Sequence, residues 1–216
     1  LPYPPVGGVR IRSYNLLKEI SKYNQVHFIG LIQRGQQRDE KEVRSAVNAL
    51  KAFCKSVTVY PFESWRSKFG WYFLAAKSLF SFKAQKERWA KSYRMALAIR
   101  DLLKKEAVDV VHFDTISLLQ YLKEVGENTP IVVNHHNIES LMMHRRAENE
   151  KNPLIKIYCY LEGCKLKKLE RLYCPRAMNL VVSELDKTRL ESVTETQGTK
   201  IIPNGVDLDF AKSMDQ

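Results

Sequence analysis

Two apolar runs in this sequence each lead directly into polar side chains that can do chemistry. Residues 131–133 are followed by Asn134 and then by the adjacent pair His135 and His136. The predicted strand at residues 108–113, rich in valine, is followed by Asp114, whose carboxylate can accept a hydrogen bond from a hydroxyl group. Ligands bind open α/β sheets outside the carboxyl ends of the strands. We therefore expect a binding site where these two runs end.

The two histidines have both a functional and a structural interpretation. Neighbouring residues of an extended strand point to opposite faces, so at most one of His135 and His136 lines a given pocket. An adjacent pair also lacks the spacing of two metal ligands on one element. The structural alternative is a histidine that caps the next helix or packs beneath it. For Asp109, at the start of the predicted strand at residues 108–113, the simpler interpretation is that it ends the turn before that strand.

A glycine pair near the start of the chain precedes a predicted helix. Gly7 and Gly8 fit a turn whose backbone N–H groups face an anion, because a helix N-terminus favours phosphate. Arg10 and Arg12 add positive charge beside it. The alternatives are a purely structural turn and arginines on a solvated face.

Composition describes an ordinary globular chain with a basic bias. The 216 residues are 44% hydrophobic and carry a net charge of +11. No run of about 18 apolar residues is present to span a membrane, and no secretory signal opens the sequence. The four cysteines form no CxxC pair, which favours buried or half-buried thiols in a reducing cytosol over metal ligation or disulfides. We expect a cytoplasmic protein.

Strand-like and helix-like segments alternate along the chain. This alternation predicts one α/β domain with a Rossmann-like, doubly wound, mostly parallel sheet and helices on both faces. A doubly wound domain normally begins with a strand before its first phosphate-binding turn, so we also expect such a strand upstream of Leu1. Strands are predicted at residues 26–32, 57–60, 108–113, 131–135, 179–183 and 200–202. Helices are predicted from Ile11 to Ile20 and at residues 39–53, 65–80, 83–106, 115–125, 139–172 and 184–193, with a break at Asn152-Pro153.

Two of these helices receive more specific predictions. In the first, Ile11, Tyr14, Leu16, Leu17 and Ile20 form the apolar side and Arg12 lies on the polar side. In the helix at residues 184–193, Ser183 is expected to be the N-cap.

Residues 65–105 combine bases with aromatic side chains. The segment holds eleven bases, two acids and all three tryptophans of the chain. It fits docking on an anionic membrane surface, which would place the protein peripherally at the inner face of the cell membrane. The alternatives are nucleic-acid binding, for which no known module is present, and solvated helices with an aromatic core face. The candidates for facing the membrane are Trp65, Arg66, Lys68, Trp71 and Lys77.

Five short motifs occur in an order that resembles the N-terminal domain of GT-B glycosyltransferases of family 4. They are G-G-x-R, D-V-V-H, H-N-I-E, V-S-E-x-D and I-P-N-G-V-D, and the resemblance runs from Leu1 to Asp207. It implies that residues 1–207 are the acceptor-side half of a GT-B architecture. Residues 208–216 would begin the interdomain linker. The C-terminal donor-binding domain, with its E-x₇-E motif, would be absent from this sequence.

The resemblance also implies an activity and the residues that carry it. The activity is transfer of a sugar, with retention of anomeric configuration, from a UDP- or GDP-type nucleotide sugar to a glycan or lipid-linked acceptor. No metal and no cofactor are expected. The alternatives are a GT-B-like nucleotide-sugar epimerase and a non-catalytic, basic membrane- or nucleic-acid-binding module. His136 is expected near the reaction centre, and the residues expected to bind acceptor or donor phosphate are Gly7, Gly8, Arg10, Arg12, Asp114, Asn137, Asn204 and Gly205.

Overall fold

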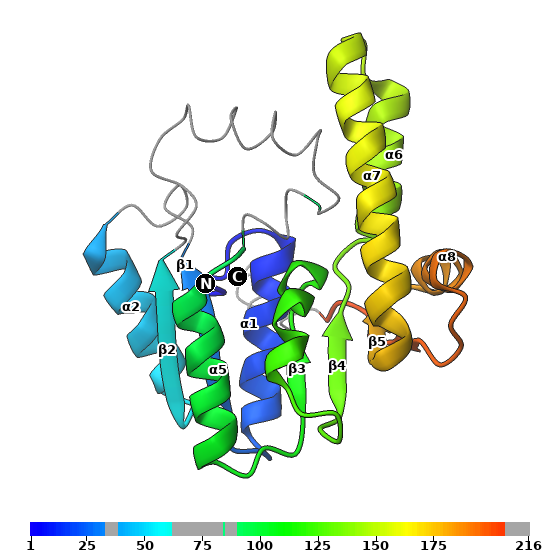
Figure 1. The fold of residues 1–216 in the computed structure, drawn as a ribbon. Coiled ribbons are helices and arrows are strands. Elements are labelled where there is room, and N and C mark those ends of the chain that lie inside the picture. Colours follow the sequence, from blue (N-terminus) through cyan, green and yellow to red (C-terminus); the bar gives the residue numbers. More distant parts are fainter. Residues whose placement is uncertain (33–38, 62–83, 85–89, 206–216) are drawn as a thin grey trace, which may run out of the picture.

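The computed structural model describes residues 1–32, 39–61, 84 and 90–205, and shows an α/β fold built on parallel strands (Figure 1). Every strand pair is parallel, which confirms the predicted fold class. The described strands form two sheets, one of two strands and one of four, and not the single sheet that was expected. The orders are β1(His27–Ile32)-β2(Ser56–Pro61) and β3(Val111–Phe113)-β4(Ile131–Asn134)-β5(Met178–Val181)-β6(Lys200–Ile201).

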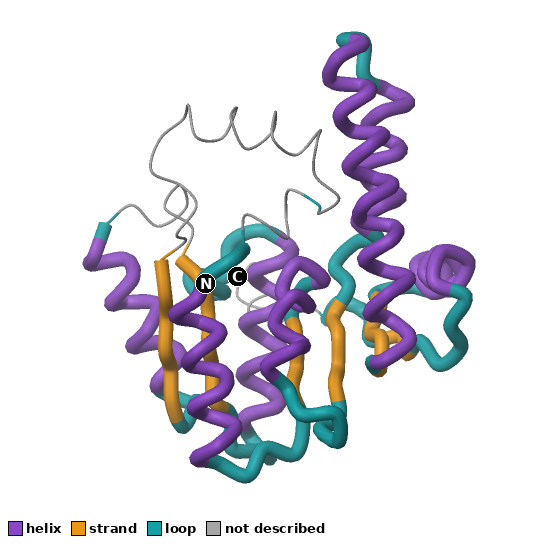
Figure 2. Tube along the Cα trace, in the orientation of Figure 1, coloured by secondary structure: helices purple, strands orange, loops and turns teal. Residues whose placement is uncertain are grey.

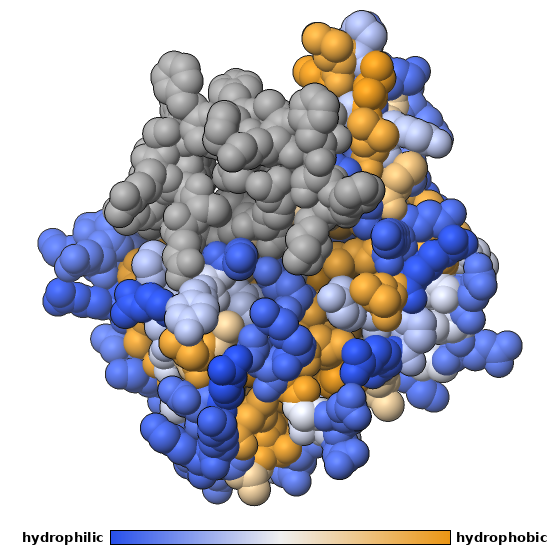
Figure 3. Space-filling model, in the orientation of Figure 1, coloured by the Kyte–Doolittle hydropathy of each residue, from blue (hydrophilic) through white to orange (hydrophobic). Residues whose placement is uncertain are grey.

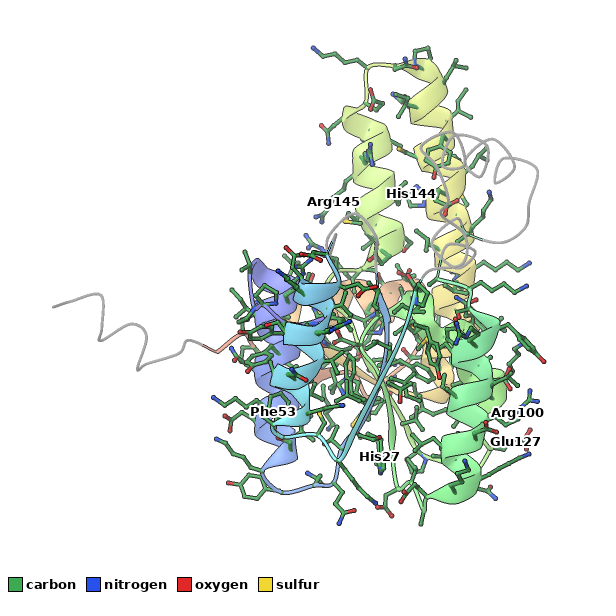
Figure 4. All side chains as sticks on the ribbon, turned by 90° about the vertical axis from the view of Figure 1, so that its left-hand side faces the viewer. His27, Phe53, Arg100, Glu127, His144 and Arg145 are labelled. Carbon is green, nitrogen blue, oxygen red and sulfur yellow. The ribbon has the colours of Figure 1, made fainter. Side chains whose placement is uncertain are left out.

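Helices cover both faces of the strands, as predicted. Seen from the side, α1(Gly8–Ser21) and α2(Glu40–Lys51) lie on one face and α5(Tyr93–Lys105) lies on the other (Figure 4). The 3₁₀ helix η1 stands in place of the regular helix expected after β3, and a short 3₁₀ turn, η2(Cys174–Arg176), precedes β5. The remaining elements are α1(Gly8–Ser21), α2(Glu40–Lys51), α5(Tyr93–Lys105), η1(Ile116–Glu124), α6(Glu139–Asn149), α7(Pro153–Tyr173) and α8(Glu184–Thr194).

Side-chain caps decide where several helices begin. Ser183 accepts a hydrogen bond from the Asp186 N–H, which confirms the predicted cap of α8. The break expected at Asn152-Pro153 is also confirmed. The Asn152 side chain accepts from the Leu154 N–H at 3.0 Å, and Pro153 occupies the first helical position, where its missing N–H costs nothing.

Two further predicted elements differ from the structure, and a third lies outside the described residues. Within the expected range 83–106, the described helix α5 begins at Tyr93, because the Ser92 side chain caps it by accepting from the Met95 N–H. Met95 and Ile99 are the buried residues of this helix, whereas Tyr93 is 68% exposed. The strand expected at residues 108–113 is reduced to Val111–Phe113, the only part that pairs with β4. The helix expected at residues 65–80 lies outside the described residues.

A single main core joins the two sheets. Its fully buried members include Leu119 of η1, Val133 of β4 and Leu166 of α7, and Ile29 and Leu31 of β1 pack against it. Of the four cysteines, all free, three are buried and Cys164 is exposed, contrary to expectation. No helix in the described part of the chain is long and apolar enough to cross a membrane.

Helices α6 and α7 form an antiparallel hairpin that extends past the carboxyl ends of the strands (Figure 2). Close packing at Gly163 holds the two helices together. A Cβ added at Gly163 would lie 2.9 Å from the imidazole ring of His144, and that ring also contacts Tyr160 edge-on. Figure 4 shows His144 and Arg145 on α6, of which His144 is half-buried and Arg145 is exposed.

Candidate functional site

Polar side chains gather at the carboxyl ends of β3 and β4. Phe113 pairs with Val133, so the next residue of each strand, Asp114 and Asn134, emerges at the same edge. Asn134 Nδ2 donates to Asp114 Oδ1 at 3.0 Å, and His136 Nε2 lies 3.3 Å from the same oxygen. Two of the residues expected at a strand-end site, Asp114 and His136, are therefore in contact.

The first turns of α1 complete this cluster. Ser13 Oγ donates to Asp114 Oδ2 at 2.6 Å. Arg12 donates from Nε and Nη2 to Asn134 Oδ1, at 3.4 and 3.3 Å. Its Nη1 donates to Asn204 Oδ1 at 3.1 Å and to the carbonyl oxygen of Pro203 at 3.3 Å. One guanidinium thus joins α1, the end of β4 and the segment after β6.

The prediction that Arg12 lies on the polar side of its helix is wrong. Arg12 is only 7% exposed, whereas Ile11 and Ile20 are 41% and 39% exposed. The inversion has a chemical cause. The face of α1 over the strand ends meets the Asn134 and Asn204 oxygens, which need a donor, and an arginine fork supplies several donors at once.

Asp114 is held as a carboxylate. Burial pushes its pKa upward, but hydrogen bonding and charge from His136, with further hydrogen bonds from Ser13 and Asn134, outweigh burial and leave the pKa below its usual value. Burial lowers the pKa of Arg12, and the nearby Asp114 charge partly offsets this. A guanidinium keeps its proton in proteins, so the cluster contains a fixed positive and a fixed negative charge.

The glycine pair begins α1 directly ahead of Arg12. Gly7 is the N-cap, with a φ of 83° that favours glycine, and no side chain caps the helix. No atom of the described residues lies within 4 Å of a Cβ built on Gly7 or on Gly8, so these residues leave this helix N-terminus open. The first turn holds no acidic residue, and Arg10 within it is half-buried. These features suit an anion.

The two histidines point in different directions, as predicted from strand alternation. His135 is 3% exposed, and its Nε2 lies 2.9 Å from Asn179 Oδ1. Burial lowers the pKa of His135, the bond to Asn179 opposes this, and the charge of His136 adds to it. His135 therefore matches the structural alternative of a packed histidine, and His136 is the one beside Asp114.

The remaining predicted residues lie at the margin of the cluster or outside the described chain. Asn137 and Gly205 are exposed and lie next to His136 and Asn204 in sequence. Sequence reasoning missed Ser13. It noted that Asn134 ends an apolar run but did not include Asn134 among the expected binding residues. The membrane-facing candidates Trp65, Arg66, Lys68, Trp71 and Lys77 lie outside the described residues.

Two further observations concern metal binding and cavities in the described residues. In the part of the chain that the structure describes, no group of three or more His, Cys, Asp or Glu side chains is placed to bind a metal ion. A pocket of about 210 Å³ lies at the opposite edge of the four-stranded sheet, lined by residues that include Val125, Pro130 and Arg176. Its lining includes the start of β4 at Ile131, so it is separate from the cluster around Asp114 at the other end of the strands.

Comparison with known proteins gives one match. A family model described as Glycosyltransferase Family 4 matches residues 6–210, which is nearly the whole chain. No curated protein and no solved structure matches this chain. The matched range contains all the residues of the cluster, from Arg12 to Asn204.

Proposed function

Because the chain belongs to glycosyltransferase family 4, we propose that it forms the acceptor-side half of an enzyme that transfers a sugar from a nucleotide diphosphate donor to a glycan or lipid-linked acceptor. The observation that carries this proposal is the Asp114 carboxylate. It is fixed by Ser13, Asn134 and His136 at the edge where α/β sheets bind ligands.

Each part of the cluster has a role in such a transfer. The Asp114 side chain is 46% exposed, so an acceptor hydroxyl can reach it. His136 is oriented by Asp114 and Asn134 and faces the sugar that moves. The open N-terminus of α1 and its arginines offer positive potential to the departing diphosphate, whose charge grows as the bond to the sugar breaks.

The donor nucleotide is held, on this proposal, mainly by a second Rossmann-like domain. Transfer then requires both domains, because positioning of donor against acceptor supplies much of the rate enhancement. Residues 1–216 by themselves are expected to turn over no nucleotide sugar. Tight, stoichiometric binding of a UDP- or GDP-sugar by this chain, measured by calorimetry, would contradict the division of roles.

A chimera tests the activity directly. Residues 1–207 are joined to the donor-binding domain of a characterised family 4 enzyme and incubated with labelled nucleotide sugar and a membrane lipid extract. The expected product is a labelled glycoside with the anomeric configuration of the donor. His136→Ala and Asp114→Asn are expected to lower turnover by about 100-fold or more. Asp109→Asn, the same change in an exposed turn at the other end of β3, leaves it unchanged.

The products separate this proposal from its alternatives. If the product is a free sugar that is an epimer of the donor sugar, and no glycoside forms, the protein is a nucleotide-sugar epimerase. Turnover that is insensitive to both His136→Ala and Asp114→Asn removes the cluster from the active site.

A further inference from the structure

The tip of the α6–α7 hairpin carries an exposed apolar surface. All residues from 151 to 157, which join the two helices and begin α7, are exposed. Among them Leu154 is 77% exposed and Ile157 is 55% exposed. Figure 3 shows apolar surface at this far end of the hairpin. The other large apolar side chains exposed near it on α7 are Ile155, Tyr160 and Leu161.

This surface lies in front of the candidate site and not behind it. The hairpin rises from the same edge to which the strands point, and α6 begins three residues after His136 (Figure 1). A helix of 21 residues, the length of α7, is about 30 Å long. A surface touched by the tip therefore faces the carboxyl edge of the sheet, where Asp114 lies.

Positive charge surrounds the apolar tip. Arg145 and Arg146 are exposed in the second half of α6, and Lys151 and Lys156 are exposed around the turn. The acids of the same region are Glu148 and Glu150, and Glu150 accepts a hydrogen bond from the Asn152 N–H. Bases thus outnumber acids, a pattern that favours an anionic lipid surface.

We propose that this hairpin tip, residues 151–157 with Arg145 and Arg146, inserts into an anionic membrane leaflet. The proposal deepens the proposed function, because it would bring the site towards a lipid-linked acceptor. A bilayer suits the shape of the tip better than a second protein does. Stable protein interfaces bury about 800 Å² on each partner over some 20–30 residues, which a convex turn between two helices does not offer.

Vesicle flotation with the 216-residue chain tests the proposal. The probes are vesicles of phosphatidylcholine alone and of phosphatidylcholine with phosphatidylglycerol. The chain is expected to float with the anionic vesicles, and Leu154→Asp/Ile157→Asp is expected to weaken this at least about tenfold at every salt concentration. The control Leu185→Asp changes a leucine that is 57% exposed on α8 and leaves binding unchanged.

A second pair of variants tests the charges. Lys151→Glu/Lys156→Glu is expected to weaken binding to anionic vesicles by about fivefold for each base, most strongly at low salt. Lys104→Glu/Lys105→Glu makes the same change of charge at the end of α5, near the opposite edge of the strands, and is expected to have a much smaller effect. Circular dichroism and thermal melting verify that each variant folds, as exposed side chains should allow.

Three outcomes overturn the proposal. Wild-type protein that binds neither kind of vesicle excludes membrane insertion. Leu154→Asp/Ile157→Asp that binds like wild type places the contact elsewhere, for example in residues 65–105. A wild-type dimer that this variant converts to a monomer, detected by light scattering, assigns the tip to a second copy. Vesicle binding needs no sugar chemistry, so a chimera that binds vesicles but transfers no sugar disproves the proposed function alone.

Discussion

Arg12 Nη1 donates a hydrogen bond to Asn204 Oδ1 at 3.1 Å and so joins residues 192 positions apart in the chain. The same guanidinium bonds to Asn134 through Nε and Nη2. The asparagine of the I-P-N-G segment, one of the five motifs of the family resemblance, is therefore fixed to the first helix. Substitution of Arg12 should therefore remove hydrogen bonds both in the strand-end cluster and in this segment.

Replacement of Arg12 by lysine should destabilise the fold by about 2 kcal/mol. The single ammonium group of lysine cannot reach Asn134 and Asn204 together, so one of them is left without its partner. Urea unfolding measures the difference. Arg44→Lys is the matched control, because Arg44 pairs with Glu40 on an exposed face of α2 and should change the free energy of unfolding by less than about 0.5 kcal/mol. Equal effects of the two changes would show that the fork geometry of Arg12 is unimportant.

Asp114 should make stability depend on acid pH. Its folded-state pKa lies below the usual value, so the folded state binds this proton less tightly than the unfolded state. Its contribution is complete above the ordinary carboxyl pKa of about 4 and is lost as the pH falls through the lower folded-state value. Urea unfolding of wild type and Asp114→Asn between about pH 6 and pH 3 should show their difference shrinking towards acid.

Glu170 should give the opposite pH dependence. It is fully buried on α7, where its carboxylate accepts from the N–H and the Oγ of Ser140 at the start of α6. Burial raises its pKa, although the bonds from Ser140 oppose this. The stability of wild type relative to Glu170→Gln should therefore be greatest below about pH 4 and decline as the pH rises through the folded-state value.

The same side chain allows a structural test of the loop that carries His136. Glu170→Ala leaves the buried Ser140 groups without an acceptor and should cost about 3 kcal/mol, measured by urea unfolding near neutral pH. Glu170→Gln keeps an oxygen for the Ser140 N–H and should cost much less. Hydrogen exchange at residues 135–140 should be faster in the alanine variant than in the glutamine variant, and similar rates would refute this role for Glu170.

Gly163→Ala should destabilise the hairpin. In an unhindered helix interior this change gains about 1 kcal/mol, because alanine is the better helix former. At Gly163 the new methyl group meets the His144 ring at 2.9 Å, so either the ring or the packing of α6 against α7 must shift. His144→Ala removes the obstacle, and the double variant should recover most of the loss in thermal unfolding. A destabilisation by Gly163→Ala that persists unchanged without the His144 ring would locate the conflict elsewhere.

The sequence by itself determined the class of fold and the edge at which to look for a site. Apolar runs of strand length that alternate with helical segments predict parallel strands covered by helices, and local chemistry sets the helix starts at Asn152-Pro153 and Ser183. Strand alternation also separated His135 from His136. These features depend on neighbours in the chain, so they can be read from the sequence.

Only the tertiary structure decided how the cluster is assembled. Periodicity placed Arg12 towards solvent, because a charged residue ordinarily avoids burial. The hydrogen bonds that its guanidinium donates to Asn134, Pro203 and Asn204 make its burial favourable. The position of Ser13 against Asp114, 101 residues later, likewise has no local signal. Residues so distant in the chain come into contact only when the strands have paired in register. The hydrogen bonds that offset the cost of burying the Arg12 charge depend on those contacts.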